Sequence, residues 1–311
     1  MLLHAIPPAA AFAIHSGMVF TAALAAGPAR RIALVPATLG FVVPWLVSPD
    51  HPLIRAVLTL GALLCLFRTV DLIRERRSWP FWRRLLLMSY PFDTRSVARA
   101  PRSFDGPRLL AAVGYLLLGA AGLWVALFLA PASGAGRWAL RWGGGAVFAY
   151  CMPDVTVNFL TFVHRALGVV MPPVHRTPIL SRTVQEFWGE RWNLLVHSWL
   201  ARHCFMPLAR RRRPQLGVAA AFGASTALHA WLALVVGGAW AAVTMGSFFV
   251  VQGVLLLVER RLGAARWPSP LARAFTVVAL LVPSPLFVEP SLAAFEASRV
   301  LESSPVASIA H

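Results

Sequence analysis

Two groups of residues in the sequence have side chains that could do chemistry. The first is a polar and aromatic block from Glu186 to Asn193, which reads Glu-Phe-Trp-Gly-Glu-Arg-Trp-Asn between apolar segments. The second is His229, which stands further along the chain inside an apolar run. An imidazole can take a proton from a hydroxyl group, and a carboxamide can stabilise a developing negative charge. The two groups would form a reaction site if the fold brings them into one chamber.

His229 has three interpretations from its position alone. An unsatisfied polar group deep in a membrane costs several kcal/mol, so a histidine there is a functional candidate. It could be a packing histidine bonded to a backbone carbonyl, a general base, or a ligand or proton-relay site. The spacing of the residues leaves all three open.

The elements that must position these residues are membrane helices. The chain has 311 residues, of which 58% are hydrophobic and only 13% charged, about half the charged fraction of a soluble domain. The net charge is +17, but the basic residues are all arginines that stand between apolar runs, where they set topology and contact anionic headgroups. This placement argues against a nucleic-acid partner and predicts an integral, multi-pass membrane protein.

Apolar segments that could span a membrane recur along the whole chain. They cover residues 9–26, 32–48, 52–70, 109–131, 139–170, 215–237, 242–259 and 274–290. The predicted fold class is therefore all-α, a polytopic transmembrane helical bundle of about eight spans, with interfacial or re-entrant helices enclosing a reaction chamber. We expect one membrane-embedded domain over residues 1–311, with its core at 52–290 and a flexible tail at 291–311.

Most arginines fall in the connections after the first, third, fifth and seventh segments, which the positive-inside rule makes cytoplasmic. The block from Phe187 to Asn193 would then lie on the cytoplasmic side. The all-arginine usage, together with many Ala, Gly and Pro residues, suggests a bacterial plasma membrane. In the connection 71–108, tryptophans stand among arginines, as in a topology-setting loop at the headgroups. Some of these arginines could also bind the phosphates of a nucleotide-bearing substrate.

The connection 171–214 carries the block. Thr183 and Glu186 have the spacing of a capping box, which predicts a helix from Phe187 towards Phe205. That helix is too polar to span alone, so it should lie at the interface or enter a protein-lined cavity. His197 would share a helix face with Asn193 and take either a chamber role or a packing role.

Two local pairs in this connection also have competing readings. Glu190 and Arg191 could pair with each other or bind an acceptor. His203 and Cys204 are adjacent, but without a second pair they do not predict a metal site. Cys65 and Cys151 are remote from each other and from Cys204 and indicate neither a disulfide framework nor a zinc ribbon.

The block from Phe187 to Asn193, with Ala-Leu-His ending at His229 downstream in an apolar run, resembles the membrane-bound O-acyltransferase superfamily, and most closely its wax-synthase-like branch. The continuation from Asn193 to Trp199 and the earlier Pro-Phe-Asp-Thr-Arg from Pro91 to Arg95 are also similar to that branch. The resemblance covers roughly residues 65–262 and rests on motifs.

The resemblance implies transfer of a fatty acyl group from acyl-CoA to a lipophilic long-chain alcohol, giving a wax ester. His229 would be the base that deprotonates the alcohol, and Asn193 would orient the substrate or stabilise charge near the acyl carbonyl. No bound cofactor or metal is expected; acyl-CoA is a substrate, and the remaining partners are the alcohol and membrane lipids. Candidate substrate-binding residues are Phe187, Trp188, Glu190, Arg191, Trp192, His197 and Ser225.

The sequence also departs from its apparent relatives. Sterol- and diacylglycerol-acylating members have a Tyr and an acidic residue where Trp188 and Gly189 stand, and wax synthases often have an acidic residue where Ala230 stands. The residue that orients His229 would then be Glu190, Ser225 or Gln252.

These departures keep other functions open. One alternative is acylation of a sterol-like, glycerolipid or secondary-metabolite hydroxyl. A transporter or a structural membrane protein is less favoured, since neither an inverted repeat nor ionisable groups on several spans are visible.

Overall fold

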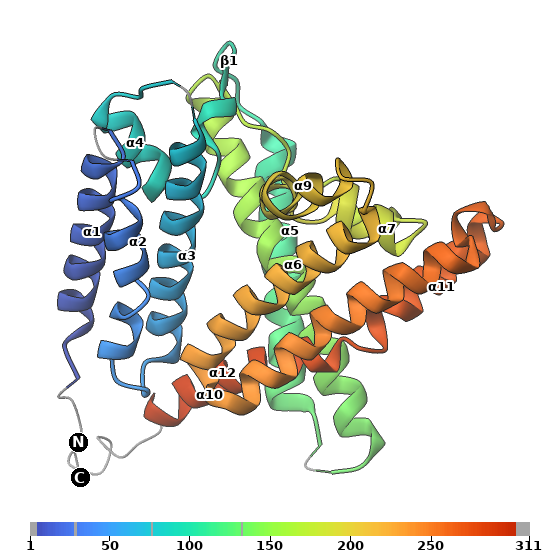
Figure 1. Ribbon diagram of the computed structural model, residues 1–311. Coiled ribbons are helices and arrows are strands. Elements are labelled where there is room, and N and C mark those ends of the chain that lie inside the picture. Colours follow the sequence, from blue (N-terminus) through green and yellow to red (C-terminus); the bar gives the residue numbers. More distant parts are fainter. Residues whose placement is uncertain (1–4, 28–29, 76, 132, 303–311) are drawn as a thin grey trace, which may run out of the picture. The chain divides into compact units, whose positions relative to one another are not determined.

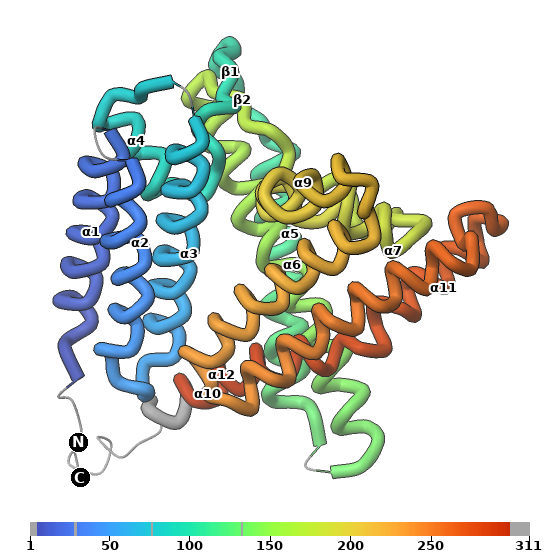
Figure 2. Tube along the Cα trace, in the orientation of Figure 1, coloured from blue at the N-terminus to red at the C-terminus, as the bar shows by residue number. Residues whose placement is uncertain are grey.

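The computed structural model describes residues 5–27, 30–75, 77–131 and 133–302. The described chain is helical apart from one short pair of strands and the connecting segments (Figures 1 and 2). Its internal contacts divide it into two compact units. Unit 1 contains Met1–Arg95, Trp231–Ala242 and Ala293–His311, and unit 2 contains Ser96–Ala230 and Val243–Leu292. The expected single domain over residues 1–311 stays a prediction.

Unit 1 is built from helices that pack through small side chains. Its elements are α1 (Pro8–Ala25), α2 (Leu34–Leu39), η1 (Val43–Leu46), α3 (Pro52–Arg74) and α4 (Phe81–Ser89). Alanines of α1, among them Ala22 and Ala23, are buried against Leu72 of α3 and Leu87 of α4. The short helix α4 lies in the arginine- and tryptophan-rich connection, with Leu87 packed inward and Trp82 exposed, as an interfacial helix requires.

Buried ion pairs attach the loop after α4 to α3. The Arg95 guanidinium donates to Asp71 at 2.5 Å and to Asp93 at 2.7 Å. Arg68 lies 3.5 Å from the Asp93 carboxylate. Burial alone would raise the pKa of Asp93, but hydrogen bonds and charge from Arg95 hold that pKa below its ordinary value. This cluster holds the Pro-Phe-Asp-Thr-Arg segment in place.

Unit 2 begins with the two-stranded pair and two long helices. These elements are β1 (Ala98–Arg99), α5 (Gly106–Trp124) with its π-helical extension η3 (Val125–Leu129), α6 (Ala135–Ala166) and β2 (Val169–Val170). The strands are antiparallel. The helices α5 and α6 approach closely at Gly122, where the lack of a side chain leaves room. A Cβ at this position would lie only 2.7 Å from the Gly144 carbonyl oxygen. The long fifth segment is thus one continuous helix, although it contains Pro153.

The predicted interfacial helix is a series of short turns. These are η4 (Pro178–Leu180), α7 (Val184–Glu186), η5 (Phe187–Arg191), α8 (Leu194–Leu200), η6 (Ala201–Phe205) and α9 (Met206–Ala209). The cap at Thr183 is confirmed, since its Oγ1 accepts from the Glu186 amide at 2.9 Å. The continuous helix from Phe187 to Phe205 is wrong, because the backbone of Asn193 is left-handed, with φ 43°, and a new helix starts there.

The helix α10 (Pro214–Leu262) reverses its direction at Gly238, whose φ of 76° and ψ of −168° are not helical. Such angles are essentially restricted to glycine. The two arms lie against each other: a Cβ at Gly246 would lie 3.4 Å from the Ala230 Cβ, and one at Gly253 would lie 3.1 Å from the Phe222 Cβ. The arms correspond to the predicted segments 215–237 and 242–259 (Figure 1).

The chain ends with α11 (Ser269–Leu281) and α12 (Pro285–Glu302). Residues 291–302 belong to α12, and Leu292 is 1% exposed, so this stretch is not the expected tail. Burial of Leu292 against Val288 and Ala126 accounts for the continued helix. The remainder of the expected tail, 303–311, lies outside the described residues.

By length and composition, five of the described helices could cross a membrane, or six if the bent pair α11 and α12 is one span. The expected number of about eight is higher for two reasons. The segment Leu34–Leu46 is shorter than a span, and α10 counts once although it turns back at Gly238. The all-α, multi-pass fold class is confirmed.

Candidate active site

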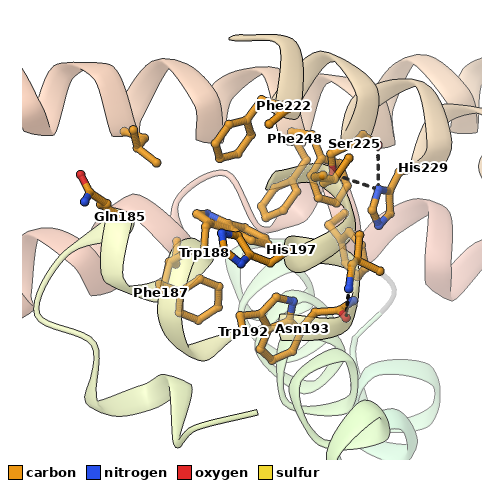
Figure 3. A pocket seen from close by; sticks show the side chains of 18 of the residues that line it. Gln185, Phe187, Trp188, Trp192, Asn193, His197, Phe222, Ser225, His229 and Phe248 are labelled. Atoms are coloured by element: carbon orange, nitrogen blue, oxygen red, sulfur yellow. Dashed lines mark hydrogen bonds between the residues drawn. The ribbon is translucent and has the colours of Figure 1, made fainter. Parts of the chain in front are cut away.

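A cavity of about 560 Å³ lies within unit 2 and collects most of the residues singled out by sequence. Its walls come from α6, the turns of the 187–205 segment, both arms of α10, and α11 and α12. Figure 3 shows Phe222, Ser225 and His229 on α10 facing the turns that carry Trp188, Asn193 and His197. The predicted residues that line the cavity are Phe187, Trp188, Glu190, Trp192, Asn193, His197, Ser225 and His229.

His229 is oriented by the backbone of its own helix. Its Nδ1 lies 2.8 Å from the Ser225 carbonyl oxygen and 3.5 Å from the Ser225 hydroxyl. A carbonyl oxygen only accepts, so Nδ1 carries the proton and donates it, and Nε2 keeps its lone pair. One face of the imidazole stacks on Phe249, with ring centroids 3.8 Å apart. This tautomer is the one in which Nε2 can take a proton.

The orienting group is therefore the main chain at Ser225, and neither Glu190 nor Gln252. Gln252 is fully buried and has a different function: its Oε1 accepts from the Trp188 indole at 3.1 Å, and its Nε2 donates to the Ala279 carbonyl at 2.9 Å. These bonds fix Trp188 as part of the cavity wall.

Asn193 caps the helix α8. Its Oδ1 accepts from the Val196 amide at 3.3 Å, and its own carbonyl accepts from the His197 amide at 2.9 Å. Asn is the residue type that tolerates a left-handed backbone best after glycine. The capping bond uses the side-chain oxygen, so within the described chain the Nδ2 group keeps its hydrogens for another acceptor. A carboxamide in this state is a hydrogen-bond donor beside the cavity.

Two aromatic residues of the block, Phe187 and Trp192, form a stack next to Asn193 in the chain. The Phe187 and Trp192 rings lie 5.4 Å apart at an interplanar angle of 14°, and Trp192 also stacks on His175. His197 lies at the cavity wall outside the spanning helices. Burial lowers the pKa of His197, and the negative charge of Glu190 acts in the opposite direction. The chamber role of His197 stays a prediction.

Arg191 is the one predicted substrate-binding residue that does not line the cavity. It pairs with Glu186 at 2.6 Å, and not with Glu190, and donates to the Arg176 carbonyl at 2.9 Å. Burial would raise the pKa of Glu186, but the Arg182 amide and Arg191 lower it. The Glu186 Oε2 accepts from the Arg182 amide at 2.7 Å, so the Glu186 carboxylate lies between Arg182 and Arg191.

Sequence reasoning missed three features of the site. Phe249, which stacks on His229, was one of many apolar residues, and only the hairpin of α10 brings it opposite the histidine. Arg260 lines the far end of the cavity, where its Nε donates to the Gln185 Oε1 at 2.9 Å. Asp154 and His175 form a buried pair; an acidic residue in the middle of an apolar segment was the signal that could have found it.

Among the described residues, no group of three or more His, Cys, Asp and Glu side chains could hold a metal ion. His203, which stands beside Cys204, packs on Trp199 with ring centroids 4.6 Å apart. Neither residue lines the cavity.

The helices and the chamber define a class of protein, a polytopic integral membrane protein with a polar site inside an aromatic-walled cavity. Residues 171–251, which carry the block and His229, match the model of the membrane bound O-acyl transferase family. This match confirms the predicted resemblance to that superfamily.

Curated proteins similar to this chain support the wax-synthase-like branch. A probable long-chain-alcohol O-fatty-acyltransferase 2 of Arabidopsis thaliana is 33% identical over 37% of this chain and 36% of its own length. A probable long-chain-alcohol O-fatty-acyltransferase 3 of the same plant is 32% identical over 33% and 32%. The long-chain-alcohol O-fatty-acyltransferase of Simmondsia chinensis is 30% identical over 35% and 34%. The alignments span about a third of these curated relatives, which are plant proteins and give no support to a bacterial origin.

Proposed function

We propose that this protein is an acyl-CoA-dependent membrane O-acyltransferase that esterifies a long-chain alcohol with a fatty acyl group, giving a wax ester. The observation that carries the proposal is that His229 and Asn193 line the same cavity. His229 offers an unprotonated Nε2, and Asn193 offers an Nδ2 group without a partner in the described chain. The names of the similar plant proteins agree with an alcohol acceptor and a fatty acyl group.

The chemistry needs only these two groups. As the alcohol oxygen attacks the thioester carbonyl carbon, its proton moves to the His229 Nε2. The Asn193 Nδ2 group donates a hydrogen bond to the carbonyl oxygen, which becomes negative in the tetrahedral intermediate. The carbon–sulfur bond then breaks, and the imidazolium returns the proton to the leaving thiolate. The products are an ester and free CoA, and the histidine regains its starting tautomer.

The polar end of the cavity supports a nucleotide-bearing donor. Arg260 lies on the second arm of α10, whose Gly246 packs opposite Ala230, the neighbour of His229. At 1.5 Å per residue, Arg260 is about 21 Å along that arm from Gly246. The extended pantetheine arm of CoA spans roughly 15 Å, at about 3.5 Å for every three backbone-like bonds. The arginine side chain covers the remainder, so the CoA phosphates could reach Arg260 while the thioester reaches His229.

The acceptor side of the cavity is apolar. Phe248, Phe249 and Phe287 form its walls, and hydrocarbon chains gain about 0.8 kcal/mol for each buried CH₂ group. A flexible long-chain alcohol suits such walls. Acylation of a sterol-like, glycerolipid or secondary-metabolite hydroxyl is the alternative, and it would use the same residues. The arginine distribution further supports a cytoplasmic location for the block, where acyl-CoA is available.

An ester-formation assay tests the proposal. Purified protein is given labelled long-chain acyl-CoA with a panel of long-chain alcohols, sterols and diacylglycerol. We expect esters of the long-chain alcohols, and a loss of about 10² to 10³ in kcat for His229→Ala and for Asn193→Ala. His203→Ala, which changes a histidine outside the cavity, is the matched control. Undiminished ester formation by a folded His229→Ala variant would refute the role of the base.

A further inference from the structure

A second histidine and a carboxylate are buried behind the block without a part in the reaction described above. Asp154 lies in α6, and His175 lies in the loop before η4. The His175 Nδ1 is 2.9 Å from the Asp154 Oδ1, and the two side chains are only 4% and 7% exposed. The other carboxylate oxygen, Oδ2, is buried and has no hydrogen-bond partner among the described residues. Such burial is costly, so the pair needs a compensating role or a structural cause.

The His175 ring is attached to the block through an aromatic stack. It lies parallel to the Trp192 indole, with centroids 4.7 Å apart and an interplanar angle of 15°. Trp192 stacks in turn on Phe187. Because Asp154 fixes the imidazole from one edge, the plane of the stack is fixed relative to α6. Trp192 directly precedes Asn193, so the plane of its indole limits the backbone that leads into Asn193.

The main chain beside His175 holds the other side of Asn193. The Leu194 amide donates to the Val174 carbonyl at 2.8 Å, and the Arg176 amide donates to the Arg191 carbonyl at 2.9 Å. These two bonds bracket Asn193, whose left-handed φ of 43° is uncommon for a residue other than glycine. The loop that carries His175 is thus bonded on both sides of the residue that offers its Nδ2 group to the cavity.

We propose that Asp154 and His175 are positioning residues that fix the backbone and side-chain orientation of Asn193 for the acyl transfer. The inference rests on the proposed function, since it assigns the purpose of Asn193 to that reaction. Asp154 anchors His175, His175 fixes Trp192, and the loop around His175 fixes the left-handed turn. Displacement of a catalytic group by about 1 Å can cost about 10²-fold in rate. The Asp154–His175 pair can therefore affect the rate without contacting the substrate.

The pair can be removed without leaving a buried charge. His175→Ala leaves Asp154 unpaired and could unfold the protein, whereas Asp154→Leu with His175→Phe replaces both members by apolar side chains and keeps a ring against Trp192. We expect this double variant to fold with a near-normal Tm. Its kcat should fall about 10-fold, and its KM for acyl-CoA should stay unchanged, because Asn193 acts on the transition state.

A double-mutant cycle separates positioning from a general loss of structure. In an Asn193→Ala background the replacement of the pair should have no further effect on kcat, since the residue through which it acts is gone. Losses that multiply in the combined variant would overturn the proposal. Wild-type kcat in the Asp154→Leu, His175→Phe variant would also overturn it.

Hydrogen exchange gives a readout that does not need the enzyme activity. The amides of Leu194 and Val196 are protected by Val174 and by the Asn193 side chain. They should exchange at least several-fold faster in the Asp154→Leu, His175→Phe variant, and at the wild-type rate in His203→Ala. Unchanged exchange overturns the positioning role, whether or not the protein forms esters. If exchange is faster in the Asp154→Leu, His175→Phe variant but the wild-type protein makes no ester, only the proposed function is refuted.

Discussion

Replacing Arg260 by alanine should raise the KM for acyl-CoA and leave the chemical step intact. Arg260 lines the cavity at the end of α10, and its Nε is bonded to Gln185. Both Nη groups are without a hydrogen bond in the described part of the chain, so they remain available to a phosphate, which a guanidinium binds with paired hydrogen bonds. The neighbouring Arg261 is also exposed but does not line the cavity.

The size of the effect follows from the exposure of Arg260. A hydrogen bond to a charged group contributes about 1.5–3 kcal/mol, and solvent screening at an exposed site places Arg260 at the lower end. Since about 1.4 kcal/mol is a tenfold change, the KM should rise about 10-fold. The kcat should change less than about twofold, because the reacting carbonyl is about 20 Å away along the helix.

The assay compares acyl-CoA with an S-acyl-pantetheine that lacks the phosphates. The wild type should have a lower KM for acyl-CoA than for S-acyl-pantetheine. In the Arg260→Ala variant the KM values for the two donors should be about equal, and kcat should be normal for both. Arg261→Ala should behave as the wild type. If Arg260→Ala raises the KM for both donors equally, or if Arg261→Ala has the same effect, Arg260 does not bind the phosphates and the reasoning from the cavity is refuted.

Two further predictions concern stability. Gln252→Leu removes the buried partner of the Trp188 indole and of the Ala279 carbonyl, which should lower the free energy of unfolding by about 2–5 kcal/mol. The Tm in detergent should therefore fall, whereas Gln185→Leu, the exposed control, should leave it unchanged. An unchanged Tm for Gln252→Leu contradicts the prediction. In the folded protein the pKa of Asp93 is lowered from its ordinary value of 3.8. The ionised carboxylate therefore stabilises the fold at a pH above that value, and this stabilisation is lost as the pH falls through the folded pKa. The Tm advantage of the wild type over Asp93→Asn should therefore be full at pH 6 and shrink below about pH 4; a constant gap would disprove the linkage.

The periodic and compositional features of the fold could be predicted because they are local. Apolar runs predicted the helices, and proline stands at the start of most of them, as in α1, α3 and α10. The turn at Gly238 was also foreseeable, since the sequence separates two spans there. The break at Asn193 was not, because the residues from Phe187 to Phe205 have helical composition. Bonds from the distant Val174 and Arg176 stabilise the left-handed turn, and no local pattern encodes them.

The site was predictable where side-chain type decides the chemistry. His229 was a candidate because a titratable side chain in an apolar run is rare, whereas Asn193 was singled out by the resemblance of its block to the family. The pairing of Arg191 with Glu190 was wrong for a physical reason: Glu190 is closer in sequence, but the turns of η5 carry the guanidinium to Glu186. Contacts between remote segments, such as Phe249 on His229, depend on the register of the α10 arms, which composition does not determine.

The bond between the His229 Nδ1 and the Ser225 carbonyl makes the orientation of this imidazole independent of any other side chain. Many catalytic histidines depend on a neighbouring carboxylate, which a single substitution removes. Here the acceptor is a peptide oxygen one turn earlier in the same helix, and every residue type supplies that oxygen. A substitution at position 225 or 230 that keeps the helix should therefore leave the His229 tautomer unchanged.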